Sequence, residues 1–363
     1  MAIAGPHRPA AEFFERAPFL VFWETTRACD LVCQHCRAEA MPERHPGELS
    51  TEEGVALLDE IAAMGTPLVV LTGGDPTKRP DLLELVAHGA SRGLRMALTP
   101  SATPLVAEEL LEALRGAGLS RLAMSLDGSD PTTHDGFRGV VGSYERTVRL
   151  LRAARRLGLT TQVNTSIVRR NAGQLERIAT QLERLDIELW AVFLVVPTGR
   201  ASASLLLDAE ETERLLERLA DVAEHAPFDV KTTAAPHFRR VLLQRKVARE
   251  QIRGLADGIG RAPRSVNEGQ GVCFVSHTGE VYPSGFLPLS CGNVRQPGGL
   301  TRIYREHPLM RQLRDPDALG GKCGRCEFRR VCGGSRARAF AVWGEPLAEE
   351  PACAYEPRAA PAR

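Results

Sequence analysis

Three cysteines near the N-terminus are the residues of this chain most suited to metal chemistry. Cys29, Cys33 and Cys36 have CxxxCxxC spacing and follow the apolar stretch Phe19–Trp23. Cysteine thiolates hold the iron of iron–sulfur clusters, normally with one thiolate per iron. Three thiolates for four irons leave one iron open to an outside ligand, as in a catalytic metal site. The spacing therefore predicts a [4Fe–4S] cluster with an open iron site.

A zinc knuckle is the alternative interpretation of the same segment. Zinc usually takes four protein ligands in a structural site, and His35 lies inside the cysteine loop as a possible fourth one. The three cysteines alone leave both alternatives open.

The other six cysteines lie between residues 273 and 353, and none occurs between residues 37 and 272. Cys323-x2-Cys326-x5-Cys332 is followed by Cys353, and Cys273 and Cys291 lie upstream. This distribution predicts two separate cofactor regions, with a zinc ribbon as the alternative for the second. The N-terminus lacks an apolar signal core, so we expect a cytoplasmic protein in which cysteines bind metal or catalyse rather than form disulfides.

The bulk composition is that of an ordinary globular enzyme. The chain has 363 residues, 43% of them hydrophobic, and a formal net charge of +1. Such a chain can bury a large core without disulfides. The near-neutral charge gives no argument for a nucleic-acid partner, and no apolar run of about 18 residues predicts a membrane span.

Short apolar runs alternate with amphipathic helical stretches up to about residue 200. The expected strands are Phe19–Trp23, Leu68–Leu71, Arg95–Leu98, Arg121–Ser125, Thr161–Ser166 and Trp190–Val196. Expected helices include one that starts with the capping box Ser50–Glu53, and others at Pro80–Ser91, Val106–Ala117, Ser143–Leu157, Asn171–Leu185 and Asp208–Ala223. Nearly continuous apolar strands are typical of a parallel sheet covered on both faces. We predict an α/β fold, a partial (β/α)6 TIM-like barrel, with a small cysteine-rich C-terminal α+β domain.

In such sheets the loops at the carboxyl ends of the strands build the site, and the motifs there resemble the radical S-adenosylmethionine (SAM) superfamily. Thr72-Gly73-Gly74-Asp75-Pro76 is similar to that family's GGE motif, with Asp75 in place of the usual Glu. The resemblance implies that SAM binds the open iron and is cleaved reductively to a 5′-deoxyadenosyl radical. It also implies that SAM is contacted by Gly73, Gly74, Asp75, Ser125, Asp127 and Asn164.

The C-terminal cysteines resemble the SPASM/twitch extension of radical SAM maturases. That resemblance implies at least one auxiliary [4Fe–4S] cluster, on Cys323, Cys326, Cys332 and Cys353. Cys273 and Cys291 are two further metal-ligand candidates, and free thiols are the alternative for them. The implied organisation is an N-terminal extension (1–17), a radical SAM core (18–228), a mostly helical bridging segment (229–270), the SPASM/twitch domain (271–355) and a tail (356–363).

Several segments look most like radical SAM proteins of the alternative haem and haem d1 pathways, among them Ser276–Pro283 and Cys332–Ala339. The branch implies a tetrapyrrole substrate whose side chain is modified or decarboxylated. A ribosomal peptide is the alternative substrate, and flavodoxin or ferredoxin is the implied electron donor. A basic set of residues suits carboxylate binding or, more simply, a solvated helix face: Arg200, Lys231, His237, Arg239 and Arg240.

Overall fold

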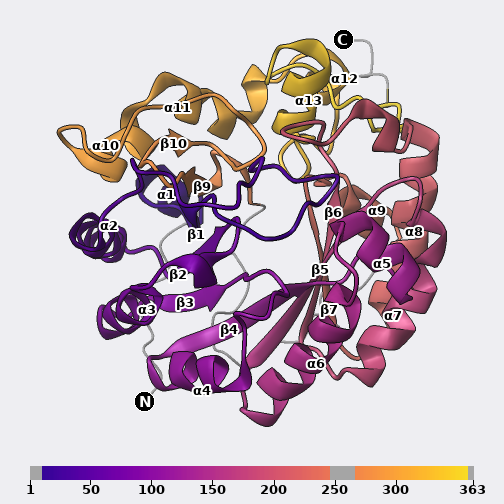
Figure 1. Ribbon diagram of the computed structural model, residues 1–363. Coiled ribbons are helices and arrows are strands. Elements are labelled where there is room, and N and C mark those ends of the chain that lie inside the picture. The colour runs from indigo at the N-terminus through magenta and orange to yellow at the C-terminus, as the bar shows by residue number, and fades with distance from the viewer. Residues whose placement is uncertain (1–9, 246–265, 359–363) are drawn as a thin grey trace, which may run out of the picture.

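The computed structural model describes residues 10–245 and 266–358 (Figure 1). The strands are β1 (Leu20–Thr26), β2 (Leu68–Gly73), β3 (Arg95–Leu98), β4 (Leu119–Ser125), β5 (Thr160–Ile167), β6 (Leu189–Leu194), β7 (Asp229–Thr233), β8 (Asn267–Glu268), β9 (Gly271–Val275) and β10 (Val281–Tyr282). The α-helices are α1 (Ala10–Arg16), α2 (Thr51–Met64), α3 (Leu82–Ser91), α4 (Glu108–Gly116), α5 (Pro131–Arg138), α6 (Ser143–Arg156), α7 (Leu175–Arg184), α8 (Ala209–His225), α9 (Phe238–Gln244), α10 (Gly299–Glu306), α11 (Pro308–Arg314), α12 (Gly321–Arg325) and α13 (Arg336–Trp343). Short 3-10 helices are η1 (Pro76–Lys78), η2 (Ala172–Gln174), η3 (Ala203–Leu205) and η5 (Pro316–Ala318).

The strands form one sheet in the order β10-β9-β1-β2-β3-β4-β5-β6-β7, with β8 paired to β9. Neighbours from β1 to β7 run parallel, and helices cover the outer face of this curved sheet (Figure 1). The prediction of a partial TIM-like barrel is confirmed, and each of the six expected strands is present within a few residues of its predicted limits. Helix α2 begins with the expected capping box, in which Ser50 and Glu53 each bond the other's backbone N–H.

One expectation about the bridging segment is wrong. Asp229–Thr233 is not helical but forms β7, which pairs in parallel with β6 and extends the barrel by one strand. Its polar sequence, DVKTT, gave no apolar run, because only part of this edge strand is buried. Helix α9 follows it, and the rest of the predicted helical stretch, residues 246–265, lies outside the described residues. The limits of the predicted domains remain predictions.

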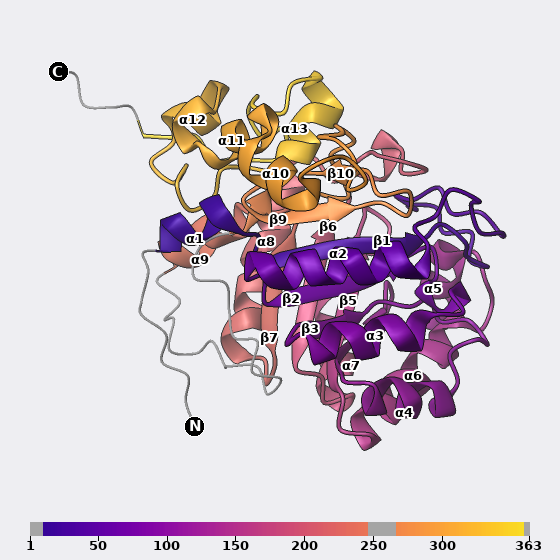
Figure 2. The same ribbon diagram turned by 90° about the vertical axis from the view of Figure 1, so that its left-hand side faces the viewer.

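The C-terminal region is joined to the barrel through the sheet itself. Strands β9 and β10 form a hairpin, in which they pair antiparallel. Strand β9 also pairs in parallel with β1, from Leu20 opposite Val272 to Trp23 opposite Val275. Helices α10 to α13 lie beyond this edge of the sheet (Figure 2). The first strand therefore lies between the barrel and the C-terminal region, and the cysteine loop that follows β1 lies close to both.

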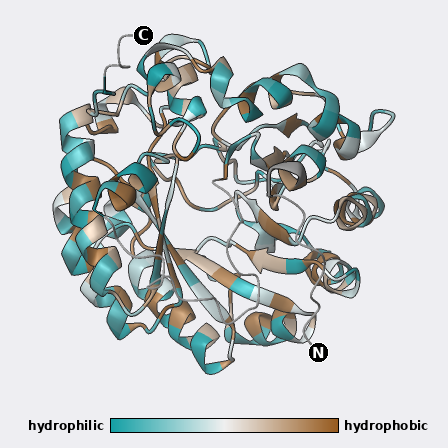
Figure 3. Ribbon diagram, turned by 180° about the vertical axis from the view of Figure 1, so that it is seen from behind, coloured by the Kyte–Doolittle hydropathy of each residue, from teal (hydrophilic) through white to brown (hydrophobic). Residues whose placement is uncertain are grey.

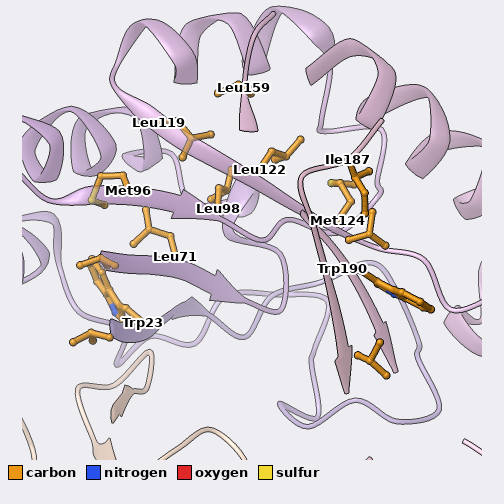
Figure 4. Packing of buried hydrophobic residues seen from close by; sticks show 14 of the residues in the cluster. Trp23, Leu71, Met96, Leu98, Leu119, Leu122, Met124, Leu159, Ile187 and Trp190 are labelled. Carbon is orange, nitrogen blue, oxygen red and sulfur yellow. The ribbon is translucent and has the colours of Figure 1, made fainter. Parts of the chain in front are cut away.

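The core lies between the sheet and the outer helices, where strand residues such as Trp23, Leu71 and Trp190 are fully buried (Figure 4). Hydrophobic colour concentrates on the strands and inward helix faces, and hydrophilic colour on the outward faces (Figure 3). Gly54 of α2 makes room for Trp23, since a Cβ there would lie 2.6 Å from the indole ring. Truncation of such a buried aromatic side chain costs about 3–5 kcal/mol. Within the described residues, no helix is long and apolar enough to cross a membrane.

Candidate functional site

A cavity of about 220 Å³ opens at the carboxyl ends of β1 to β6. All three N-terminal cysteines line it. Four of the six residues predicted to contact SAM also line it. The cavity wall includes Cys29, Cys33, Cys36, Gly73, Gly74, Ser101, Ser125, Asn164, Ser166, Val195 and Phe286. The structure therefore brings together residues that are up to 257 positions apart (Cys29 to Phe286) at one end of a parallel sheet.

Glycines hold the cysteine loop against the barrel. A Cβ at Gly73 would lie 2.4 Å from the Thr26 carbonyl oxygen, and one at Gly74 would lie 2.4 Å from that of Ala28. The backbone N–H of Gly74 donates to Thr26 O at 2.8 Å. On the opposite side, Gly199 has φ +60° and packs against the Cys36 carbonyl. The two glycines of the predicted motif are thus required for close backbone approach to the segment that leads into the cysteine loop.

Each cysteine of the loop has a polar neighbour at its sulfur. Cys29 Sγ lies 3.2 Å from Ser101 Oγ, and Arg138 Nη1 lies 3.7 Å from Cys33 Sγ. The backbone N–H of Ala40 donates to Cys36 Sγ at 3.4 Å. Burial raises the pKa of the Cys29 and Cys33 thiols, while Ser101 and Arg138 respectively oppose that rise. These donors favour sulfur that carries negative charge, as cluster-bound thiolate does.

Asp75 lies in the predicted motif but does not line the cavity. Its buried carboxylate accepts hydrogen bonds from the Thr77 backbone N–H at 3.1 Å and from the hydroxyls of Thr77 and Thr103 at 2.7 and 2.9 Å. Burial raises its pKa, and these hydrogen bonds oppose the rise. The expected direct contact of this carboxylate with SAM is not what the geometry shows, because the short side chain caps η1 within its own loop.

Asp127 is also fully buried behind the cavity wall rather than lining it. Its carboxylate accepts from Arg138 Nε at 2.7 Å and from the Ser166 backbone N–H at 2.7 Å. Burial alone would raise its pKa, but Arg138, together with His35, His134 and the Ser166 N–H, outweighs burial, so the pKa is lowered. Asp127 therefore acts on the cavity through Arg138, which reaches Cys33. The family resemblance implied a direct role for Asp127, because a sequence motif cannot show which way a strand-end side chain points.

A buried charge network was missed by sequence reasoning. Glu24 at the carboxyl end of β1 accepts from Arg37 Nη2 at 2.6 Å and lies 2.8 Å from His277 Nδ1. Arg37 lines the cavity and stacks over the Phe274 ring, with its guanidinium carbon 4.5 Å from the ring centroid. Burial would raise the pKa of Glu24, but Arg37 and His277 hold it below its ordinary value. The network joins β1, the cysteine loop and the C-terminal hairpin.

His35 stacks face to face on Phe137, with ring centroids 4.0 Å apart. Burial lowers its pKa to about 3, so the ring is neutral at pH 7. A zinc site requires several such side chains around one ion. Across residues 10–245 and 266–358 no three His, Cys, Asp or Glu side chains are arranged around a single ion position. Cluster ligands lie farther apart, because each thiolate binds a different iron.

A second cavity lies in the C-terminal region. Its wall contains the four thiols of Cys323, Cys326, Cys332 and Cys353. Burial raises the pKa of Cys332 to about 12 and that of Cys353 to about 11. Backbone N–H groups point at two of the sulfurs, from Phe328 to Cys326 at 3.4 Å and from Glu350 to Cys323 at 3.3 Å. Four thiols with N–H donors around one cavity fit an iron–sulfur cluster.

Cys273 and Cys291 lie elsewhere, and neither lines the second cavity. Both are buried in the main apolar core with Leu300 and Ile303 of α10. Burial raises the pKa of both, that of Cys291 to about 12, and no cation is among the causes. The expectation that they ligate metal is not supported by this geometry, which is that of small apolar core residues.

The predicted basic set divides into separate places. His237 and Arg240 are buried and Arg239 is half-buried, so the expected solvated helix face is wrong. His237 and Arg240 line the second cavity, and Arg239 donates to the Val266 carbonyl at 2.8 Å. Arg200 is exposed beside the cysteine loop, where its backbone N–H donates to Cys36 O at 3.0 Å. Arg200, His237, Arg239 and Arg240 therefore lie beside the two cysteine regions rather than along one solvent-facing surface.

Residues 23–182 match the Radical SAM superfamily. An AdoMet-dependent heme synthase of Oleidesulfovibrio alaskensis is 42% identical over 347 residues, which cover 94% of this chain and 89% of that protein. The chain belongs to the radical SAM superfamily. A PqqA peptide cyclase of Rhodopseudomonas palustris is 30% identical over 94% of this chain and 88% of its own length. The crystal structure of Streptococcus suis SuiB bound to S-adenosylmethionine has a TM-score of 0.70 at 16% identity, covering 94% of this chain and 78% of SuiB, and shows the same fold.

Membership establishes the class of chemistry. This radical SAM protein is an enzyme that uses a [4Fe–4S] cluster and SAM. When both are bound, one-electron cleavage of SAM supplies a 5′-deoxyadenosyl radical for hydrogen abstraction. The residues around the first cavity fit these groups in their donor chemistry: three thiols, N–H and hydroxyl donors at the sulfurs, and cavity-lining glycine backbone at the end of β2.

Proposed function

We propose that this enzyme is a SAM-dependent heme synthase that converts propionate side chains of an iron tetrapyrrole to vinyl groups. The observation that carries the proposal is the 42% identity to an AdoMet-dependent heme synthase over nearly the whole of both chains. The proposed ligands of the SAM-cleaving cluster are Cys29, Cys33 and Cys36. Gly73, Gly74, Ser125 and Asn164 are proposed to contact SAM, and Asp75 and Asp127 to position the walls of its site.

The first cavity has a wall that suits an aromatic macrocycle with acidic side chains. Phe193 of β6 and Phe286 of the C-terminal region meet edge to face, with ring centroids 6.3 Å apart, and Val195 lies beside them in the same wall. Arg37 supplies a cation in this wall, and its side chain is 20% exposed. An apolar surface with a guanidinium group can pack against a tetrapyrrole ring and bind a propionate carboxylate.

The conversion balances in atoms and electrons. Each propionate carboxylate loses one hydrogen atom from the carbon next to the ring, one carbon dioxide and one electron, and the remaining two carbons form the vinyl group. The hydrogen atom ends in 5′-deoxyadenosine. The electron needs a one-electron acceptor, and we propose that an auxiliary [4Fe–4S] cluster on Cys323, Cys326, Cys332 and Cys353 provides it.

The test is anaerobic incubation of the reconstituted full chain with SAM, dithionite and iron coproporphyrin III. We expect 5′-deoxyadenosine, and a tetrapyrrole product that has lost one carbon dioxide and two hydrogens per converted propionate by mass spectrometry. Cys29→Ala, Cys33→Ala and Cys36→Ala should each abolish both products. Formation of 5′-deoxyadenosine with no change in any propionate-bearing tetrapyrrole would reject the proposed substrate.

A ribosomal peptide is the second candidate substrate, because the chain is also 30% identical to a PqqA peptide cyclase. The discriminating result is a mass change in a precursor peptide encoded beside this gene, with tetrapyrroles unchanged.

For either substrate we propose flavodoxin or ferredoxin as the electron donor and the cytoplasm as the location. The nine cysteines form no disulfide with one another, which supports a reducing compartment.

A further inference from the structure

His237 is an unusual residue for a buried position. Its side chain is fully buried at the start of α9, directly after the loop that follows β7. Neither ring nitrogen has a hydrogen-bond partner among the described residues. Because a buried polar group without a hydrogen-bond partner destabilises the folded state, a native imidazole in this position requires an acceptor for its N–H.

The position of His237 indicates what that acceptor is. The residue lines the same cavity as the four thiols of Cys323, Cys326, Cys332 and Cys353. It belongs to the α9 segment of the barrel, more than 80 residues before the first of those cysteines. Arg240, one turn later on α9, lines the same cavity and also has a buried Nε without a partner in the described residues. Two N–H groups from one helix therefore lack acceptors beside four sulfurs.

The other side of the cavity is built in the same way. Arg336 Nη2 lies 3.8 Å from Cys323 Sγ, and the Glu350 backbone N–H donates to the same sulfur. N–H donors thus face the thiols from both α9 and the C-terminal region, which is an arrangement suited to an anionic iron–sulfur centre. Four cysteines already supply one ligand per iron, so His237 is not needed as a ligand.

We propose that His237 is a positioning residue that donates a hydrogen bond to a sulfur of the auxiliary cluster and raises the cluster's reduction potential. This inference rests on the auxiliary cluster of the proposed function. Hydrogen bonds to cluster sulfurs stabilise the more negative, reduced state, and they are one of the protein's means of tuning the potential. A higher potential favours the acceptance of the electron that decarboxylation releases.

The experiment isolates the auxiliary cluster in the full chain. Cys29→Ala, Cys33→Ala and Cys36→Ala together remove the first cluster's ligands, and the reconstituted protein is then titrated by redox potentiometry with EPR detection. In this background His237→Phe removes the donor and keeps a planar ring. We expect the full iron and sulfide content, and a ratio of reduced to oxidised cluster that falls about tenfold at a fixed potential, equivalent to about 59 mV for one electron.

Matched variants separate the hydrogen bond from a general effect on folding. His237→Gln keeps an N–H donor and should restore most of the potential. His225→Phe changes an exposed histidine at the end of α8 and should shift nothing. Cluster loss in His237→Phe that His237→Gln rescues also supports a donor. An unchanged potential in His237→Phe, or cluster loss in both His237 variants, overturns the inference. Failure of the unmodified His237 chain to bind this cluster instead rejects the auxiliary cluster of the proposed function.

Discussion

Arg338→Met tests how the C-terminal region is attached to the barrel. Arg338 of α13 has a side chain only 4% exposed, and its partner Glu350 is 1% exposed. Arg338 Nη1 lies 3.1 Å from both carboxylate oxygens of Glu350. Its Nη2 donates to the carbonyls of Leu194, at the end of β6, and Ala234, after β7, at 3.1 and 2.8 Å. One guanidinium group therefore joins the C-terminal region to two barrel segments.

The magnitude follows from the burial of both charges. Methionine fills similar space but leaves Glu350 as a buried carboxylate without its cation, and breaking such a pair costs about 3–5 kcal/mol. Because neither group is exposed, solvent screening does not reduce this figure. The Ala234 backbone, which has φ +53°, also loses the donor to its carbonyl. We expect the free energy for local opening of the C-terminal region to fall by about 3–5 kcal/mol.

The same change should make that opening depend on pH. In the unaltered protein burial would raise the pKa of Glu350, but Arg338, together with His237 and the backbone N–H groups of Ala352 and Ser335, outweighs burial, so the pKa is lowered. The stability contributed by this lowered pKa is present above the ordinary glutamate pKa and is lost only as pH falls below it. In Arg338→Met burial dominates and the pKa of Glu350 is raised. The variant then gains stability relative to the unaltered protein as pH falls through the raised value.

The assay is native-state hydrogen exchange by mass spectrometry on the reconstituted chain, following peptides that cover α13. A loss of 3–5 kcal/mol corresponds to exchange faster by roughly a hundredfold to several thousandfold. The deficit should shrink as pH falls from neutrality towards the ordinary glutamate pKa, and Arg338→Met with Glu350→Gln should recover part of it. Arg330→Met, at an exposed pair with Asp317, should cost less than about 1 kcal/mol. A deficit under about 1 kcal/mol in Arg338→Met, or one that does not change with pH, would refute this account.

Three further predictions concern the two cysteine regions. Alanine at any one of the four second-cavity cysteines, Cys323, Cys326, Cys332 or Cys353, should remove about half of the bound iron. Alanine at Cys273 or Cys291 should leave the iron content unchanged. Equal iron loss in both groups of variants would contradict the placement of Cys273 and Cys291 in the apolar core. Gly74→Ala should abolish 5′-deoxyadenosine formation and destabilise the fold by about 1–3 kcal/mol, because the new Cβ would meet backbone oxygens. The control variant Gly173→Ala, which has open space around the new Cβ, should retain activity and stability. Asp127→Ala should destabilise the protein by about 3–5 kcal/mol in chemical denaturation, because it leaves Arg138 buried without its carboxylate partner. A loss of activity with unchanged stability would instead indicate a direct catalytic contact of Asp127.

The sequence by itself determined the fold class and the first cofactor region. Parallel strands buried on both faces leave continuous apolar runs, and the six runs from Phe19 to Val196 became β1 to β6. Ligand spacing within one loop is a local property, so Cys29, Cys33 and Cys36 were recognisable without tertiary structure. The same holds for Gly73 and Gly74, because close backbone approach excludes any side chain there.

Only the tertiary structure decided what depends on side-chain direction and on contacts distant in sequence. Asp75 and Asp127 follow their strands as predicted, yet both carboxylates turn away from the cavity to bond their own loops or Arg138. The polar edge strand β7 has no apolar signal, and it forms because β6 offers an unpaired edge. Cys273 and Cys291 are identical in type to the four thiols of the second cavity, but β9 and the segment after β10 place them in the apolar core. His237 was assigned to a solvated helix face because no local pattern reveals that a loop after β7 buries it against cysteines more than 80 residues away.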